Sequence, residues 1–280
     1  MTRAIPTAVL TLTFLAPAAH AQKAVRATPP SPVPISAPAA AAAPTAAPAS
    51  VPAPSTASEV ARGAAKKLDA FQAKEARAAL EPVVSQAGSN ADVAIALGRL
   101  LEQEKKYDES AAVLRTAAAA TPADGRVPLW LGETLLRAKK MADADAAFSK
   151  AVELATQAIA ARPDDAGAFL VQGSALSRLR RYDEAMVALG KARELDGGSP
   201  ATLYQMGATR AFQQRWADAV TLLSQTLEKE TGMALAYYYR GLAQEKLGRK
   251  DLMVVDLDRF VKVAPAAPEA DRARALLAAA

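Results

Sequence analysis

The chain has 280 residues, of which 51% are hydrophobic and 22% charged, so it is long enough to bury a sizeable core. It contains no cysteine, which excludes disulfides, thiolate metal sites and cysteine-linked lipid anchors. The net charge of +5 does not indicate nucleic-acid binding, because all 29 acidic and all but three of the 34 basic side chains follow residue 55, where the charge nearly balances.

Residues 1–21 have the pattern of a secretory signal: a basic start, an apolar run and the small-x-small triplet Ala19-His20-Ala21. We expect cleavage before Gln22, export to the periplasm or the extracellular space, and no membrane span afterwards. The alternative is an uncleaved membrane anchor. The run is shorter than the ~20 residues a span needs and contains Pro6 and Pro17, which favours the signal.

Residues 22–55 consist almost entirely of Ala, Pro, Ser, Thr and Val. This composition buries too little apolar surface to offset the entropy lost on ordering, and closely spaced prolines favour an extended chain. We predict a disordered Pro/Ala-rich linker. A proline-directed recognition motif is the alternative interpretation.

The folded region is expected over 56–280. It opens with a capping box, in which Thr56 caps the first helix and Glu59 reaches back to the cap amide. Pro82 interrupts the second helix, because proline removes an interior hydrogen bond. Residues 57–90 are therefore expected to form a degenerate first repeat.

Five glycines then recur at intervals of 34, 41, 34 and 34 residues: Gly98, Gly132, Gly173, Gly207 and Gly241. In most copies, a large side chain lies nine residues after the glycine, and a small side chain lies three residues after the large one. Leu or Phe lies seven residues after the large side chain. Glycine inside a helix costs about 1 kcal/mol relative to alanine. Its recurrence at one phase predicts a second helix packed closely there, with the small residue at the contact and the large residue filling the gap between helix pairs.

This 34-residue unit, with Trp130-Leu131-Gly132, Tyr182-Asp183-Glu184-Ala185 and a closing Pro163 or Pro265, resembles a tetratricopeptide repeat. The resemblance implies an all-α fold, a right-handed α-solenoid of about five to six helix-turn-helix units. The expected units are repeats 91–124, 125–165, 166–199, 200–233 and 234–267, followed by a capping helix over 268–279.

The repeat over 125–165 is seven residues longer than the others, which is about two helical turns, so its apolar face keeps its phase. We predict one long helix from Ala142 to about Ala161 that protrudes past its neighbours. A length variant is the simpler interpretation, and a ledge for a partner is the alternative.

The mature chain has little catalytic chemistry. The one histidine, His20, lies in the signal, which removes histidine-based triads, thiol nucleophiles and zinc sites with nitrogen or sulfur ligands. Asp164 and Asp165 follow Pro163 in a turn where aspartate caps a helix. We therefore expect no catalytic residue, no metal site and no cofactor, and a protein that is not an enzyme.

The resemblance places binding on the curved inner wall, which the first helix of each repeat lines. The candidates lie on the exposed stripe beside the glycines: Arg99, Trp130, Glu133, Arg137, Arg178, Tyr204, Gln205, Tyr238 and Tyr239. Tyr, Trp and Arg often dominate peptide-binding energy. Trp130 could equally serve to pack one repeat against the next. Tyr237 lies on the helix face that is expected to be buried in the core.

In the family that this sequence resembles, a set of lysines and asparagines, with an arginine, binds the C-terminal carboxylate of a peptide. This sequence lacks that set. The corresponding inner positions are Ile95, Leu129, Leu170, Tyr204 and Tyr238. A groove that becomes more apolar toward the C-terminal repeats suits a short amphipathic helix or an extended segment.

The leading hypothesis is a non-catalytic interaction scaffold of the bacterial cell envelope or secretory pathway. It would bind a partner protein or peptide in the groove as a monomer, with no nucleic-acid partner. The alternative is a cell-wall or glycan-associated structural spacer, in which the linker threads a polymer layer.

Overall fold

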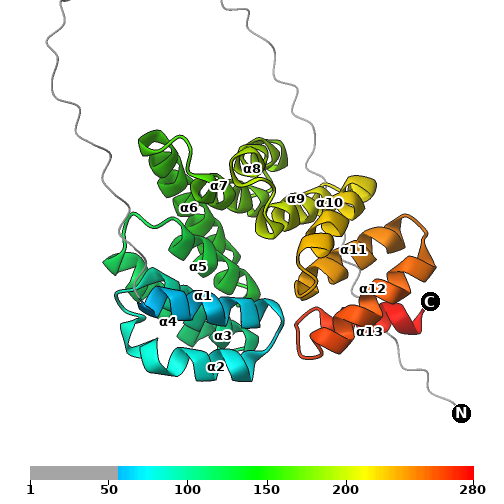
Figure 1. Cartoon of the computed structure of the whole chain (residues 1–280), viewed down its shortest axis with the longest axis horizontal. Coiled ribbons are helices and arrows are strands. Elements are labelled where there is room, and N and C mark those ends of the chain that lie inside the picture. The colour runs from blue at the N-terminus through cyan, green and yellow to red at the C-terminus, as the bar shows by residue number, and fades with distance from the viewer. Residues whose placement is uncertain (1–55) are drawn as a thin grey trace, which may run out of the picture. The chain divides into compact units, whose positions relative to one another are not determined.

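The structure, a computed structural model, describes residues 56–280, and the regular secondary structure in this range is helical (Figure 1). The signal and linker expected before residue 56 lie outside the described residues. The elements are α1 (Thr56–Asp69), α2 (Ala73–Leu80), a 3-10 helix (Glu81–Gln86), α3 (Ala91–Gln103), α4 (Tyr107–Ala120), α5 (Arg126–Arg137), α6 (Met141–Ala161), α7 (Ala166–Arg178), α8 (Tyr182–Asp196), α9 (Pro200–Phe212), α10 (Trp216–Lys229), α11 (Ala234–Lys246), α12 (Lys250–Val263) and α13 (Ala270–Ala278).

Consecutive helices pack in pairs, and the pairs follow one another in an arc (Figure 1). The expected all-α solenoid is confirmed. No helix in the described part of the chain is both long and apolar enough to cross a membrane.

The turn inside each pair has one recurring geometry. The second residue after the first helix adopts the left-handed region, and the next amide bonds to the carbonyl five residues before it, as Lys106 N does to Leu101 O (2.8 Å). The left-handed residues are Phe71, Lys105, Lys139, Arg180, Gln214 and Gly248, at intervals of 34, 34, 41, 34 and 34 residues. The turn after α1 therefore has the phase of the others.

The close approach predicted at the five glycines is confirmed. A β-carbon added to any of them would lie 2.5–3.0 Å from the Leu or Phe side chain that faces it from the second helix: Leu114, Phe148, Leu189, Leu223 or Leu257. The contact is thus made chiefly by this side chain, and not by the small residue, although Ser110, Ala144, Ala185 and Ala219 are all fully buried. The gap-filling role expected of the large residue is wrong for Met141, which is 55% exposed.

Two further expectations concern individual helices. The long helix is confirmed, because α6 spans 21 residues where α8 spans 15. In the first pair, α2 ends at Leu80 and a 3-10 helix follows, with Pro82 in its first turn, as a missing amide requires. The helix α1 begins at Thr56, the first described residue, so the capping box stays a prediction.

Gly248, the left-handed residue between α11 and α12, allows the turn geometry to be tested. We expect Gly248→Ala to lower the free energy of unfolding by about 1 kcal/mol, because a β-carbon at φ +73° is strained. No atom lies within 4 Å of where that β-carbon would be, so the loss comes from the backbone alone. Gly63→Ala in α1, equally open, should instead gain up to about 1 kcal/mol. Urea unfolding measures both, and changes of the same sign would contradict the explanation.

Candidate functional site

A cavity of about 400 Å³ lies among the first helices of the pairs. Its wall comes from α1, α3, α5, α7, α9 and the start of α11, together with Pro268 before α13. Much of the lining is apolar: Leu68, Phe71, Leu129, Leu170, Val171, Met233 and Leu235. Seven of the nine candidate residues line it as well: Arg99, Trp130, Glu133, Arg137, Arg178, Tyr204 and Gln205. The stripe chosen by helical phase therefore converges on one site.

The arginines of this wall are bound within the chain. Arg99 donates from Nη2 to Oδ1 of Asp69 (2.5 Å), and Arg178 donates from Nε to Oε1 of Glu133 (2.5 Å). Burial acts to lower the pKa of Arg178, but the Glu133 carboxylate outweighs it, so the pKa is raised and the guanidinium stays charged. These arginines are fixed in place and are not free cations awaiting an acidic ligand.

The guanidinium groups of these two arginines also lie over aromatic rings. The guanidinium of Arg99 lies 4.6 Å from the ring centroid of Trp130, and that of Arg178 lies 5.2 Å from Phe212. Such cation–π contacts stabilise by about 0.5–2 kcal/mol, more where water is excluded. Trp130 thus fulfils both interpretations of the sequence, since it lines the cavity and packs against the core between α3 and α5.

The two ends of the helical array meet at the cavity. Phe71, in the turn after α1, packs against the hydrophobic cluster formed by α11, α12 and α13. Arg137 on α5 forms an ion pair with Glu102 and donates from Nη1 to Oε1 of Glu269 (3.1 Å), 132 residues further along the chain. These contacts narrow the inner wall to a cavity that stays open to solvent, where exposed residues such as Ala201 line it.

Comparison with known proteins agrees with this architecture. Family models described as tetratricopeptide repeat match residues 67–127, 106–156, 147–200 and 204–252. The chain belongs to the tetratricopeptide repeat family. Proteins of this family are in general non-catalytic scaffolds that bind protein or peptide partners. No curated protein sequence matches the chain.

Solved structures show the same fold at low sequence identity. The tetratricopeptide repeat protein TTC0263 of Thermus thermophilus is 20% identical, with a TM-score of 0.53 over 66% of this chain and 97% of that one. The human IFIT1 dimer with m7Gppp-AAAA is 15% identical, with a TM-score of 0.51 over 68% of this chain and 46% of that one. The Cut9-Hcn1 hetero-tetramer of the APC/C is 16% identical, with a TM-score of 0.50 over 79% and 42%.

In the last repeat, the candidate Tyr238 is buried and does not line the cavity. Tyr238 is only 4% exposed and packs in the C-terminal core, with its ring centroid 5.1 Å from that of Phe260. The helix α13 supplies Ala270 and Ala273 to the same core and covers the face that the sequence left open. Burial raises the pKa of Tyr238 to about 12. Tyr237, expected on the core phase, is partly buried, packs against two core clusters of the last repeats and lies near the guanidinium of Arg240.

Tyr239 supports the cavity wall from behind. Its ring centroid lies 6.2 Å from that of Tyr204 and 5.7 Å from that of Phe212, the ring on which Arg178 stacks. Burial raises the pKa of Tyr239, and that of Tyr204 more strongly, so both hydroxyls stay protonated at neutral pH. Neither tyrosine changes charge in the range where the protein would act.

Several residues of the site were not among the candidates chosen from the sequence. Some of them could have been predicted, because they occupy the same position in the repeat as chosen candidates. Asp69, Gln103 and Phe212 occupy the same position of their repeats as Arg137 and Arg178, which were selected. Asp69 and Gln103 line the cavity, and Phe212 lies beneath Arg178. Phe71 and Glu269 have no such signal, because they reach the site only through the meeting of the two ends.

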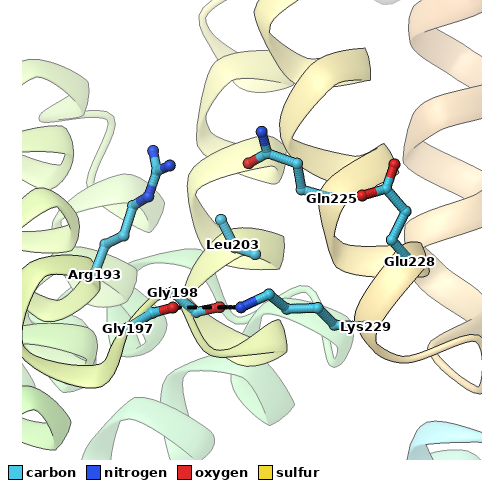
Figure 2. Close-up of a pocket in the computed structure, with 7 residues that line it drawn as sticks. All are labelled: Arg193, Gly197, Gly198, Leu203, Gln225, Glu228 and Lys229. Carbon is cyan, nitrogen blue, oxygen red and sulfur yellow. Dashed lines mark hydrogen bonds between the residues drawn. The ribbon is translucent and has the colours of Figure 1, made fainter.

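A second, smaller cavity of about 220 Å³ lies between the α8–α9 turn and α10 (Figure 2). Lys229 reaches across it from α10, and its Nζ donates to the carbonyl oxygens of Gly197 (3.3 Å) and Gly198 (2.7 Å). A cation on the last carbonyls of a helix stabilises its C-terminus. The ammonium of Lys229 is thus used within the chain, and we assign this cavity a structural role.

The same turn predicts a pH-dependent contribution to stability. Asp196 ends α8, and its carboxylate accepts from the amides of Gly198 (2.8 Å) and Ser199 (3.1 Å) and from the hydroxyls of Ser199 (2.7 Å) and Thr202 (2.6 Å). Burial acts to raise the pKa of Asp196, but these hydrogen bonds outweigh it and lower the pKa below its usual range. The carboxylate therefore stabilises the folded state above the unfolded pKa of about 3.9, and this is lost as the pH falls through the folded pKa.

We expect Asp196→Ala to reduce the free energy of unfolding by about 1–2 kcal/mol at pH 7, a typical loss for a capping side chain. The difference from the wild type should shrink below pH 4, as the wild-type carboxylate takes up its proton. Urea unfolding at pH 7, 5 and 3 measures it. A difference that stays constant over this range would contradict a role for the charged carboxylate.

Proposed function

We propose that this protein is a non-catalytic scaffold that binds a segment of one partner protein in the cavity among the first helices of its repeats. The observation that carries the proposal is the convergence of six such helices on one largely apolar space of about 400 Å³, a volume within the range of binding sites. Apolar walls with a few fixed polar groups favour binding, with the polar groups setting orientation.

The sequence left two kinds of ligand open, a short amphipathic helix and an extended segment. The wall is largely apolar, and ion-paired side chains from several helices interrupt it. We favour an extended segment, because it can insert a few side chains between these groups while its backbone stays at the mouth of the cavity.

Filling the cavity tests the proposal without disturbing the core. Ala201 is exposed, lines the cavity and is the second residue of α9, while Ala217 is exposed and is the second residue of α10, away from the cavity. We expect immobilised full-length protein with Ala201→Trp to lose a partner that the wild type and Ala217→Trp both retain from a cell extract. Equal retention by the two variants would place the binding surface elsewhere.

We further propose that the scaffold acts in the cell envelope or along the secretory pathway. This rests on the signal pattern of residues 1–21, which lies outside the described residues. Intact mass of the protein recovered outside the cytoplasm should show a chain that begins near Gln22. Retention of Met1 in that fraction would contradict cleavage and favour a membrane anchor.

A further inference from the structure

The charges around the cavity do not balance. Three guanidinium groups, those of Arg99, Arg137 and Arg178, are paired with four carboxylates, those of Asp69, Glu102, Glu133 and Glu269. Arg137 is shared between Glu102 and Glu269. A fourth lining guanidinium, that of Arg126, is paired with Asp92 and Asp124, so it does not supply the missing positive charge. The ion pairs around the cavity therefore carry negative charge in excess.

Two buried acceptor atoms, one in this network and one beside it, have no hydrogen-bond partner among the described residues. One is Oε2 of Glu269, whose other oxygen accepts from Arg137, and the second is Oε1 of Gln103. The amide nitrogen of Gln103 donates to the carbonyl oxygen of Leu68 (2.7 Å), which fixes which side-chain atom is the free acceptor. A buried acceptor without a donor destabilises the folded state, so a ligand that brings N–H groups would relieve that cost on binding.

Both acceptors lie beside the cavity. Gln103 lines it, and Glu269, which is not one of the lining residues, follows the lining residue Pro268 and is bound to the lining residue Arg137. Around them the lining is apolar, with Leu68 on the same side as Gln103. Burial raises the pKa of the Glu102 carboxyl, and the nearby Glu133 adds to the rise, which is the direction expected where negative charge is in excess.

Resting on the proposed function, we infer that the cavity recognises an extended segment of a partner protein that carries one lysine or arginine between apolar residues. The apolar side chains contact the leucine-rich wall. The cation brings the missing positive charge to the group of Glu102, Arg137 and Glu269, of which Glu102 and Arg137 line the cavity, and one of its N–H groups satisfies the free oxygen of Gln103. An acidic segment is disfavoured, because each wall arginine already has a carboxylate partner.

Calorimetric titration of the full-length protein with three blocked pentapeptides tests this inference. Their sequence is Ala-Leu-Xaa-Leu-Ala, acetylated and amidated, with lysine, the uncharged isostere norleucine or glutamate at the centre. We expect the lysine peptide to bind at least tenfold more tightly than the norleucine peptide, and the glutamate peptide to bind most weakly. Equal affinities for lysine and norleucine, or no binding of any of the three, would overturn the inference.

Two variants locate the cation. Glu269→Gln removes the excess charge and should reduce the preference for lysine over norleucine to within about threefold, while leaving the norleucine peptide unaffected. Asp271→Asn, two residues away and almost fully exposed, should leave the preference unchanged. Should Glu269→Gln not fold, Gln103→Met removes the second acceptor and should lower only the lysine affinity. Unchanged preference in a folded variant would contradict the assigned position.

Failure of this inference and failure of the proposed function are distinguishable. A partner that Ala201→Trp loses and Ala217→Trp retains would support binding in the cavity even if the lysine preference were absent. Loss of the lysine preference with retained binding would mean that the apolar wall alone selects the segment.

Discussion

We expect Asp256→Ala to lower the free energy of unfolding by about 3–5 kcal/mol, the range measured when one partner of a buried ion pair is removed. The Asp256 side chain is only 4% exposed. It accepts two parallel hydrogen bonds from Arg240, at 2.8 Å and 2.7 Å, and Arg240 also donates to the hydroxyl of Ser224 (3.1 Å). The variant leaves the Arg240 guanidinium without its carboxylate between α11 and α12.

A control on the same helix isolates the effect of burial. Asp258 forms an exposed ion pair with Lys262 (2.6 Å), so Asp258→Ala should change the free energy of unfolding by less than about 1 kcal/mol. Replacing both members of the buried pair, as Asp256→Leu with Arg240→Met, should recover most of the loss, because no charge is then left unpaired. Equal losses in the free energy of unfolding for Asp256→Ala and Asp258→Ala, measured with urea, would contradict a larger contribution from the buried pair.

We expect Gly132→Ala to lower the free energy of unfolding by about 2 kcal/mol, the difference between a steric cost at the upper end of the usual range and a gain in helix propensity. The new β-carbon would lie 2.5 Å from Cε1 and 2.6 Å from Cδ1 of Phe148. The Phe148 ring is fully buried among the side chains of α5, α6 and α7, so it cannot move away without displacing them. Overpacking of this kind costs about 1–3 kcal/mol or more, and it outweighs the gain in helix propensity of about 1 kcal/mol.

The effect of Gly132→Ala on the free energy of unfolding should change sign in a variant that lacks the Phe148 ring. In a Phe148→Ala variant the ring is absent, so the same Gly132→Ala change should stabilise the fold by about 1 kcal/mol through helix propensity. Gly190→Ala, with no atom within 4 Å of the added β-carbon, should stabilise either background by a similar amount. Urea unfolding of the wild type and of these variants measures the differences. An equal loss from Gly132→Ala in both backgrounds would contradict the proposed contact with Phe148.

The fold was predictable because its main constraint is steric and local. Five glycines at one helical phase indicate a close approach of two helices, and the structure places Leu or Phe against each of them. The turns were less accessible to sequence reasoning. Lys105, Lys139, Arg180 and Gln214 adopt the left-handed region, yet none of these residue types indicates that conformation. Their common position in the repeat was the available signal.

The site was predictable in part, and the remainder depends on long-range geometry. Helical phase selected Arg99 and Arg178 correctly as lining residues, but it could not show that each is already ion-paired with a carboxylate from another helix. Tyr238 was wrongly placed, because α13 covers it. The contribution of Glu269 depends on the curvature of the whole array, which brings it to Arg137 across 132 residues.

The most direct test of the central claim is to map where a bound peptide lies. The lysine-centred pentapeptide, with its leucines replaced by photo-leucine, is crosslinked to the full-length protein, and the modified residues are identified by mass spectrometry. We predict crosslinks to Leu129, Leu170 and Leu235, which line the cavity from α5, α7 and α11. Crosslinks confined to exposed apolar side chains of the second helices, such as Val187 on α8 and Val255 on α12, would contradict binding in the cavity.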